Sequence, residues 1–197
     1  MIIRPAIRAD LDAVASNLGT VFAADPSLGW VLRKADDPES LLADFYRLII
    51  DSAFERGIID VAEDEGDFLG SAVWTAPGQE VPASVLRKAL PLVRRLGKAA
   101  PTLLRYLRAY SAVKIPFPAW HLEVIAVTER ARGRGVGSAL LDAGLERCGD
   151  EAARLEATST RAAKLYASRG FVPLGEVKTP APVPEIIMWK PSSTLLA

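Results

Sequence analysis

The sequence predicts a single mixed α/β domain, and three observations support this. The chain has 197 residues, of which 50% are hydrophobic and 24% charged, which suits one globular domain with a sizeable core. Apolar residues alternate in some segments, as in strands, and recur at helical spacing in others. No internal repeat, low-complexity tail or domain linker divides residues 1–197. We therefore expect antiparallel strands early in the chain and strand–helix–strand crossovers late.

The first quarter of the chain predicts one strand and two helices. Residues 2–8 alternate like a strand, and Asp10 can cap a helix that ends before Asp25-Pro26. A second helix starts at Asp37-Pro38-Glu39 and stops at Gly57. The apolar faces expected to be buried comprise Leu11, Val14, Leu18, Val21 and Phe22, and then Leu41, Leu42, Phe45, Leu48 and Ile49.

Two strands and a turn come next. Residues 58–62 and 68–75 have strand patterns, and the acidic, glycine-containing residues 63–67 join them. A break with Gln, Gly and Pro follows at residues 76–82. We therefore expect an antiparallel hairpin that is followed by a loop.

A basic helical segment is inserted at about residues 82–113. Residues 85–110 have helical character, with interruptions at Gly97 and Pro101 and a kink at Pro91. The segment has no acidic residue, and its basic residues are Arg87, Lys88, Arg94, Arg95, Lys98, Arg105, Arg108 and Lys114. Two amphipathic helices with solvated charges would explain this pattern. A wall over a neighbouring site and a contact surface for an anionic partner are the alternatives.

The rest of the chain alternates strands and helices. Strands are expected at residues 120–127, 153–158, 171–177 and 185–190, and helices at 136–148 and 161–169. Gly170 ends the second of these helices, and a proline-rich segment at residues 179–184 leads to the last strand. This order of strands and helices predicts the strand–helix–strand crossovers expected late in the chain.

Charge and composition exclude several classes of function. The 24 basic residues balance the 24 acidic ones, so no net field attracts a polyanion, and we expect no nucleic-acid partner. Cys148 is the only cysteine and His121 the only histidine, which predicts neither a disulfide nor a metal site. The first residues carry charges where a signal peptide is apolar, and no stretch approaches the ~18 apolar residues of a spanning helix. We expect a cytoplasmic protein with no membrane partner.

Glycines cluster between the strand that ends at Val127 and the helix that starts at Val136. The segment is Arg132-Gly133-Arg134-Gly135-Val136-Gly137, and such glycines let backbone N–H groups approach an anion at a helix N-terminus. The dinucleotide-binding pattern fails because Ser138 and Leu140 occupy the positions of its third glycine. The Walker pattern also fails, because Gly-Lys-Ser/Thr is absent.

This segment resembles the R-x-x-G-x-G signature of the GCN5-related N-acetyltransferase (GNAT) superfamily. Residues 159–171, which include Leu165-Tyr166 and Gly170-Phe171, are similar to the second conserved block of that superfamily. The resemblance implies a GNAT-like fold, with a twisted, mostly antiparallel sheet flanked by helices and a helical insertion before the fourth strand. Further stretches are similar to the puromycin N-acetyltransferase branch: residues 22–25, 72–75, 118–120 and the proline-rich end.

The resemblance also implies acetyl-CoA (coenzyme A) as cofactor and the residues that hold it. In the family the fourth strand splays from its neighbour, so the backbone of Ile125, Ala126 and Val127 would pair with the pantetheine arm. The pyrophosphate would bind at the glycine segment and the next helical residue: Arg132, Gly133, Arg134, Gly135, Val136, Gly137 and Ser138. Ser159 stands where many members carry an asparagine that bonds pantetheine, and a serine has a shorter reach.

Candidate catalytic residues follow from the same resemblance. Tyr166 matches the family's tyrosine, whose phenol, with an ordinary pKa near 10, can protonate a departing thiolate. Glu123 and His121 share one face of the fourth strand, and either is a candidate base, directly or through a water. Ordinary packing, a salt bridge or a hydrogen bond is the alternative for each of the three. Cys148 lies within a predicted helix, so we expect direct attack in a ternary complex and no acyl-cysteine.

The expected acceptor is a primary amine of a small molecule or of a protein. A carboxylate suits an ammonium group and an aromatic ring suits a cation, so the candidate contacts are Glu123, Asp25, Trp30, Tyr46, Trp74 and Trp189. Core packing is the alternative for the tryptophans. A non-catalytic acyl-CoA sensor and an enzyme with a longer acyl group or a hydroxyl acceptor are the other hypotheses. Both a monomer and a homodimer are compatible with the sequence.

Overall fold

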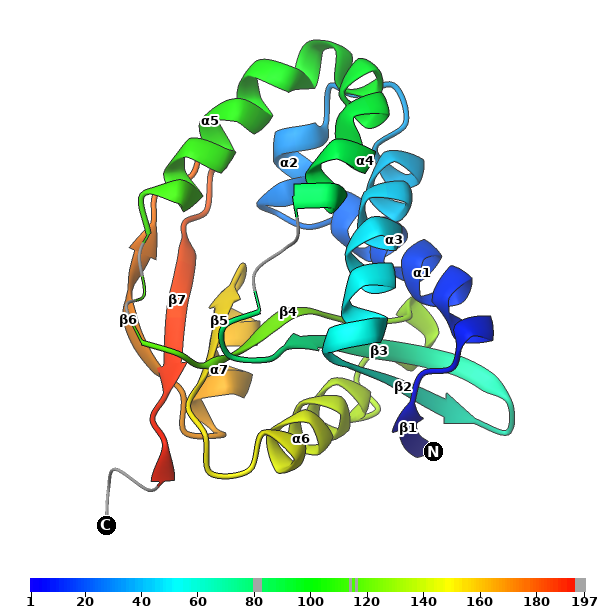
Figure 1. Ribbon diagram of the computed structural model, residues 1–197, viewed down its shortest axis with the longest axis vertical. Helices are drawn as coiled ribbons and strands as arrows, with labels where there is room; N and C mark the ends of the chain where they lie inside the picture. Colours follow the sequence, from blue (N-terminus) through cyan, green and yellow to red (C-terminus); the bar gives the residue numbers. More distant parts are fainter. Residues whose placement is uncertain (80–82, 114, 116, 194–197) are drawn as a thin grey trace.

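The computed structural model describes residues 1–79, 83–113, 115 and 117–193, and Figure 1 shows its helices and strands. One sheet of seven strands runs through this described part, in the order β1-β2-β3-β4-β5-β7-β6. Neighbouring strands are antiparallel except β4 and β5, which are parallel. The fold class predicted from the sequence is therefore confirmed. The strands are β1 (Ile2–Pro5), β2 (Ile58–Asp64), β3 (Asp67–Thr75), β4 (Trp120–Val127), β5 (Ala153–Ala157), β6 (Val172–Val177) and β7 (Glu185–Lys190).

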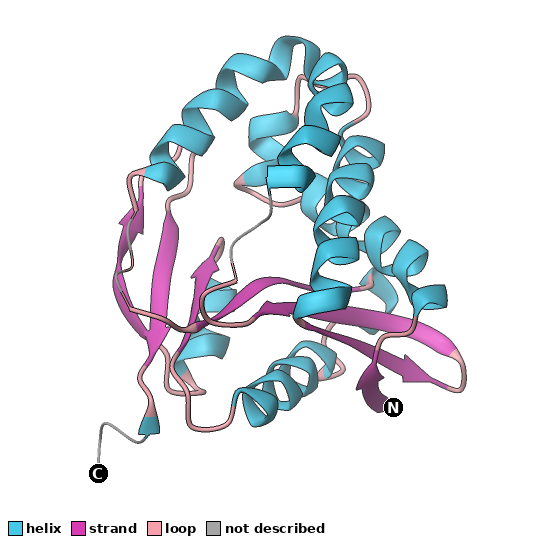
Figure 2. Cartoon of the chain, viewed as in Figure 1, coloured by secondary structure: helices cyan, strands magenta, loops and turns pink. Residues whose placement is uncertain are grey.

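Helices cover both faces of the sheet (Figure 2). One face of the sheet is covered by the first five helices, α1 (Leu11–Ala23), α2 (Leu28–Leu32), α3 (Pro38–Arg56), α4 (Ala83–Val93) and α5 (Ala100–Ser111). The opposite face is covered by α6 (Val136–Cys148) and α7 (Thr160–Ala167). Short 3-10 turns are η1 (Arg8–Asp10), η2 (Arg94–Ala99) and η3 (Glu129–Ala131). No helix in the described ranges is both long and apolar enough to span a membrane.

The structure corrects the expected start of the chain. The first strand ends at Pro5, and η1 precedes α1. Asp10 does not cap α1, because its carboxylate accepts hydrogen bonds from Arg4 Nη1 and from the backbone N–H of Ile7, both at 2.7 Å. The five-residue helix α2 is also additional, since one turn is too short to show a periodic pattern.

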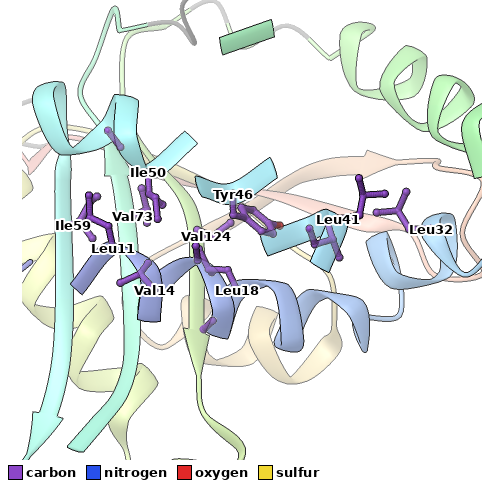
Figure 3. Close-up of a cluster of buried hydrophobic side chains, with 14 of the residues drawn as sticks. Leu11, Val14, Leu18, Leu32, Leu41, Tyr46, Ile50, Ile59, Val73 and Val124 are labelled. Carbon is purple, nitrogen blue, oxygen red and sulfur yellow. The ribbon is translucent and has the colours of Figure 1, made fainter. Parts of the chain in front are cut away.

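The second helix forms as predicted, but its buried face is rotated. Asp37 caps α3 by accepting a hydrogen bond from Ser40 N at 3.0 Å, and Gly57 follows its last residue. Phe45 is 37% exposed, whereas Tyr46 and Ile50 are buried. Both lie in the core between α1, α3 and the sheet, drawn in Figure 3.

The helical insertion breaks at Gly97, as the sequence predicts. Gly97 has φ 48° and ψ −122° inside η2, Pro101 lies in the first turn of α5, and Pro91 is inside α4. Leu96 and Ala99 are buried in the same core as α1 and α3. Residues 80–82 of the expected loop and Lys114 lie outside the described residues.

The late crossovers differ from each other. The first one, β4–α6–β5, joins parallel neighbours as expected. The second one, β5–α7–β6, passes over β7, which pairs with both β5 and β6. The predicted bounds of β5, α7 and β6 agree with the structure to within two residues.

Two irregularities of β4 shape the site. Val73 pairs with Val124 and Trp74 with Leu122, so Glu123 is an extra residue in a β-bulge. As a result Leu122 packs on the α6 side of the sheet, while Val124 packs on the α1 and α3 side. Moreover, β4 pairs with β5 only through Trp120 and His121, so the two strands part beyond that point. This opening is the splay that the resemblance implies.

Candidate active site

The glycine segment forms an uncapped helix start. Gly133 and Gly135 have φ of 80° and 81°, a left-handed conformation that side chains disfavour. A Cβ atom on either glycine would meet nothing within 4 Å. Gly135 is the N-cap of α6 and supplies no side-chain acceptor to the first-turn N–H groups. These groups and the open space beside the glycines fit an anionic phosphate.

The residues expected to hold the cofactor border this helix start. Val127 Cγ2 lies 3.5 Å from the position that a Cβ of Gly137 would occupy. Ile125, Ala126 and Val127 form the part of β4 beyond its pairing with β5. Arg132 is exposed, and Arg134 donates from Nη2 to Asp64 Oδ2 at 2.9 Å, which ties the glycine segment to the β2–β3 hairpin.

Tyr166 lies on α7 with its ring buried. It is 6% exposed and packs against Phe171, with ring centroids 6.1 Å apart. Burial raises the pKa of Tyr166 to about 12, so the phenol carries its proton at neutral pH. Its hydroxyl makes no hydrogen bond to any described residue. The phenol is therefore available as a donor.

Ser159 caps the helix that carries Tyr166. Its Oγ accepts a hydrogen bond from Ala162 N at 3.2 Å. The hydroxyl proton is still free to be donated. Ser159 therefore lies at the start of the helix that carries Tyr166 in its last turn, and capping uses part of its capacity to accept hydrogen bonds.

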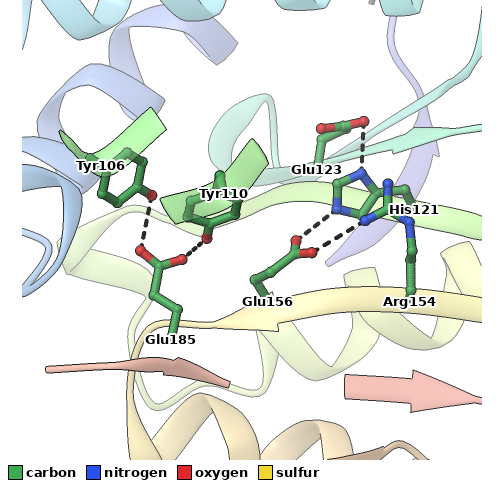
Figure 4. Close-up of polar contacts among 7 residues, drawn as sticks. All are labelled: Tyr106, Tyr110, His121, Glu123, Arg154, Glu156 and Glu185. Carbon is green, nitrogen blue, oxygen red and sulfur yellow. Dashed lines mark hydrogen bonds and ion pairs between the residues drawn. The ribbon is translucent and has the colours of Figure 1, made fainter. Parts of the chain in front are cut away.

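His121 lies between two glutamates (Figure 4). Its Nδ1 is 2.9 Å from Glu123 Oε1, and its Nε2 is 2.8 Å from Glu156 Oε2. Burial works to lower the pKa of His121, but the hydrogen bonds to Glu123 and Glu156 outweigh it and raise the pKa to about 9. Burial works to raise the pKa of Glu123, and the paired His121 lowers it below its usual value. His121 and Glu123 therefore form an ion pair on one face of β4.

Glu156 and Arg154 complete this cluster. Arg154 Nη1 donates to Glu156 Oε1 at 3.2 Å. Both residues lie on β5, where Arg154 is in register with His121. Sequence reasoning missed them, although their alternation with buried Ala153, Leu155 and Ala157 was a signal for a polar strand face.

A second polar cluster joins the helical insertion to the sheet. Glu185, the first residue of β7, is 1% exposed and accepts hydrogen bonds from Ser27, Tyr106 and Tyr110. Burial raises the pKa of Glu185, and the hydrogen bonds from Ser27 and Tyr106 oppose this only in part. Because the tyrosines come from α5, the insertion is attached to the start of β7. Sequence reasoning also missed this cluster, which has no local signature.

Asp25 and Tyr46 lie close to these clusters. Asp25 Oδ2 accepts a hydrogen bond from Thr158 Oγ1 at 2.7 Å. Tyr46 is 4% exposed, and burial first, then the charges of Asp25, Glu185 and Glu123, raises its pKa well above 10. The structure therefore brings Asp25, Tyr46 and Glu123 together on one side of the sheet.

The tryptophans lie in different surroundings, and core packing, the alternative stated above, holds for Trp74. Trp74 is fully buried, and a Cβ on Gly144 of α6 would lie 2.6 Å from its Cε2. This corrects the expectation for Trp74, which is a core residue on the opposite face from Val124. The Trp30 ring is covered by the Arg33 guanidinium, 3.5 Å from the ring centroid. Trp189 lies on β7 beside Phe117, with ring centroids 6.3 Å apart.

Cys148 is buried at the end of α6. Burial raises the pKa of its thiol to about 12. A buried, protonated thiol is a poor nucleophile. This placement agrees with direct attack and does not favour an acyl-cysteine.

Comparisons with known proteins agree with this geometry. Residues 29–171 match the family described as acetyltransferase (GNAT) family. The structure of histone acetyltransferase HPA2 and related acetyltransferase from Corynebacterium glutamicum is similar, with 38% identity and a TM-score of 0.78, covering 97% of this chain and 96% of that one. No curated protein sequence matches the chain.

More distant structures share the fold. An N-acetyltransferase from Staphylococcus aureus Mu50 is 19% identical with a TM-score of 0.63, over 96% of this chain and 100% of that one. Arylalkylamine N-acetyltransferase 2 from Aedes aegypti is 16% identical with the same TM-score, over 96% and 97%. Because the family match covers most of the chain and the bacterial structure covers nearly all of it, this chain belongs to the acetyltransferase (GNAT) family and is an acyltransferase.

Proposed function

We propose that the protein transfers an acetyl group from acetyl-CoA to a primary amine, by direct attack in a ternary complex. The observation that carries the proposal is the position of the ion-paired Glu123 on β4, next to the point where β4 and β5 separate. Glu123 lies on the strand whose residues 125–127 are expected to hold the cofactor, and it is close to Tyr46 of α3. It can take a proton from an acceptor amine, directly or through a water.

The residues that would hold acetyl-CoA fit it. The uncapped start of α6, from Gly135 to Ser138, supplies N–H donors for a pyrophosphate, and Arg132 and Arg134 add positive charge. The unpaired edge of residues 125–127 and Ser159 supply donors and acceptors for a pantetheine arm. When bound, acetyl-CoA supplies the thioester that the amine attacks.

Two residues of the chain carry out the two proton transfers of the reaction, Glu123 as the base and Tyr166 as the acid. A carbon–nitrogen bond forms, the carbon–sulfur bond breaks, and the amine loses one proton while the sulfur gains one. Glu123 is anionic at neutral pH and receives the amine proton. Tyr166 carries a proton at neutral pH and donates it to the departing sulfur.

The charges around Glu123 favour a cationic acceptor. Three carboxylates gather there, those of Asp25, Glu123 and Glu156. Within the described residues, His121 and Arg154 are the cations that pair with them. This excess of negative charge attracts an ammonium group and lowers the concentration of anionic competitors.

The acceptors worth testing come from two likenesses. Residues 22–25, 72–75 and 118–120 are similar to puromycin N-acetyltransferases, which makes puromycin a first acceptor. The Corynebacterium structure is named as a histone acetyltransferase HPA2 and related acetyltransferase, which makes lysine peptides a second. Aminoglycosides and polyamines complete the panel.

The proposal is tested by binding and turnover on the same samples. Calorimetry should show acetyl-CoA binding, and a thiol reagent should show CoA release with one amine of the panel. The buried Cys148 adds little background to the thiol signal. Tyr166→Phe keeps the contact with Phe171, so it should bind acetyl-CoA normally but lose on the order of 10²-fold in kcat. Binding without release on any amine would favour a sensor, and no binding would refute the cofactor assignment.

A further inference from the structure

Both ring nitrogens of His121 face carboxylate oxygens. Glu123 approaches Nδ1 at 2.9 Å from the same strand, and Glu156 approaches Nε2 at 2.8 Å from β5. The three side chains are each 14–20% exposed, so water screens them only in part. The second oxygen of Glu156 is held by Arg154 at 3.2 Å. Charges therefore alternate along Arg154, Glu156, His121 and Glu123.

This arrangement has a consequence for the proton on the ring. A neutral imidazole has one N–H donor and one lone pair, whereas a carboxylate ion can only accept. Whichever tautomer the neutral ring adopted, one carboxylate would face a lone pair. The imidazolium form, with an N–H on each nitrogen, satisfies both carboxylates at once.

The surroundings offer no competing partner for the ring. Among the described groups, the charged or titratable ones that face His121 are Glu123 on β4 and Glu156 and Arg154 on β5. Tyr46 of α3 lies near Glu123. Thr75, the β3 residue in register with His121, is uncharged.

We propose that Glu156 is a positioning residue, which acts through His121 and holds its ring as a doubly donating imidazolium. The clamped ring orients the carboxylate of Glu123 and keeps it anionic, so Glu123 and not the imidazole receives the proton of the acceptor amine. Glu156 itself touches neither the acceptor nor the thioester. This inference rests on the proposed function for its kinetic part only, because the state of the ring can be measured without turnover.

A single histidine makes the test direct. Because His121 is the only histidine in the chain, its ring resonances in a ¹⁵N-histidine sample need no assignment. In the wild type the ring should remain protonated through neutral pH and titrate near pH 9. In Glu156→Gln the midpoint should fall by about 1 to 3 pH units, because one of two carboxylates is lost. Glu156→Asp should restore a midpoint close to that of the wild type.

The kinetic part uses the same variants and a matched control. In Glu156→Gln, kcat with the best amine should fall on the order of 10-fold above the new midpoint, less than the loss expected for the base itself. A new ionisation should appear between pH 6 and 8, while KM for acetyl-CoA stays unchanged. Glu176→Gln, an exposed glutamate on β6, should match the wild type in both measurements.

Several outcomes would overturn the proposal. An unchanged histidine midpoint in Glu156→Gln would show that Glu156 does not hold the proton. A lowered midpoint with an unchanged pH profile of kcat would show that the ring does not act on Glu123. If the wild type acetylated no amine, the proposed function would fail together with the kinetic part, and the histidine midpoint would still decide the protonation part.

Discussion

Asp25 and Thr158 are joined by a hydrogen bond of 2.7 Å across 133 positions of sequence. The other oxygen of Asp25 accepts from the backbone N–H groups of Ser27 and Leu28, at 2.8 and 2.9 Å. Asp25 thus ties the start of α2 to the residue that follows β5. Since Ser159 caps α7 directly after Thr158, this bond connects the start of α2 to the helix that carries Tyr166.

Thr158→Val tests this connection. The change removes the hydroxyl donor and keeps the side-chain shape, so it should lower the free energy of unfolding by about 1 kcal/mol. Asp25→Ala should cost about 2 kcal/mol, because two backbone N–H groups lose their acceptor as well. Urea denaturation of the single and double variants gives a coupling energy. A strictly additive double variant would show that the hydrogen bond contributes nothing.

Gly135→Ala should separate cofactor binding from folding. Its Cβ would meet nothing, so the structural cost is the positive φ alone, about 1 kcal/mol. The added methyl group would narrow the space in front of the α6 N–H groups, so acetyl-CoA affinity should fall at least 10-fold. Calorimetry beside thermal denaturation checks both effects. Unchanged affinity would place the pyrophosphate elsewhere.

Gly144→Ala should have the opposite result. The new Cβ would overlap the buried Trp74 ring, which lies under α6, so the fold should lose about 3 kcal/mol. Gly144 is far along α6 from the glycine segment, so the folded fraction should bind acetyl-CoA normally. Denaturant midpoints and calorimetry at low temperature distinguish the two glycines. Wild-type stability would mean that Trp74 repacks freely.

Tyr106→Phe tests the attachment of the helical insertion. The hydroxyl of Tyr106 donates to the buried Glu185 at 2.9 Å, so its loss should cost about 1 kcal/mol. Loss of one of the two tyrosine hydrogen bonds should accelerate amide exchange in α5, while exchange in α6 stays unchanged. Tyr110 still donates to Glu185, so α5 should stay attached to the sheet. Mass spectrometry of exchanged peptides measures both helices. Equal protection of α5 in both proteins would contradict its attachment through Glu185.

The pH dependence of stability should report on His121. Its pKa is about 9 in the folded protein and 6.5 in an unfolded chain, so protonation favours the fold. This contribution is complete below about pH 6.5 and is lost as the pH rises through about 9. The free energy of unfolding should therefore decrease from pH 7 to pH 10. In His121→Gln this decrease should be smaller, and an identical slope would refute the ion pair.

Local sequence signals determined much of the fold and the position of the glycine segment. The bounds of β4, α6 and β7 agree with those predicted, and Asp37 caps α3 at the expected position. These features depend on alternation, helical periodicity and capping, which involve residues a few positions apart. The glycine segment could be found for the same reason.

Tertiary structure alone decided the surroundings of the candidate base. Glu156 reaches His121 across 35 positions, and Glu185 meets Tyr106 and Tyr110 across 79 and 75. Leu122 faces α6 and Val124 faces α1 and α3 because Glu123 forms a bulge between them in β4. Strand order, register and the side on which a helix packs depend on the whole core, so no local pattern specifies which distant side chains meet.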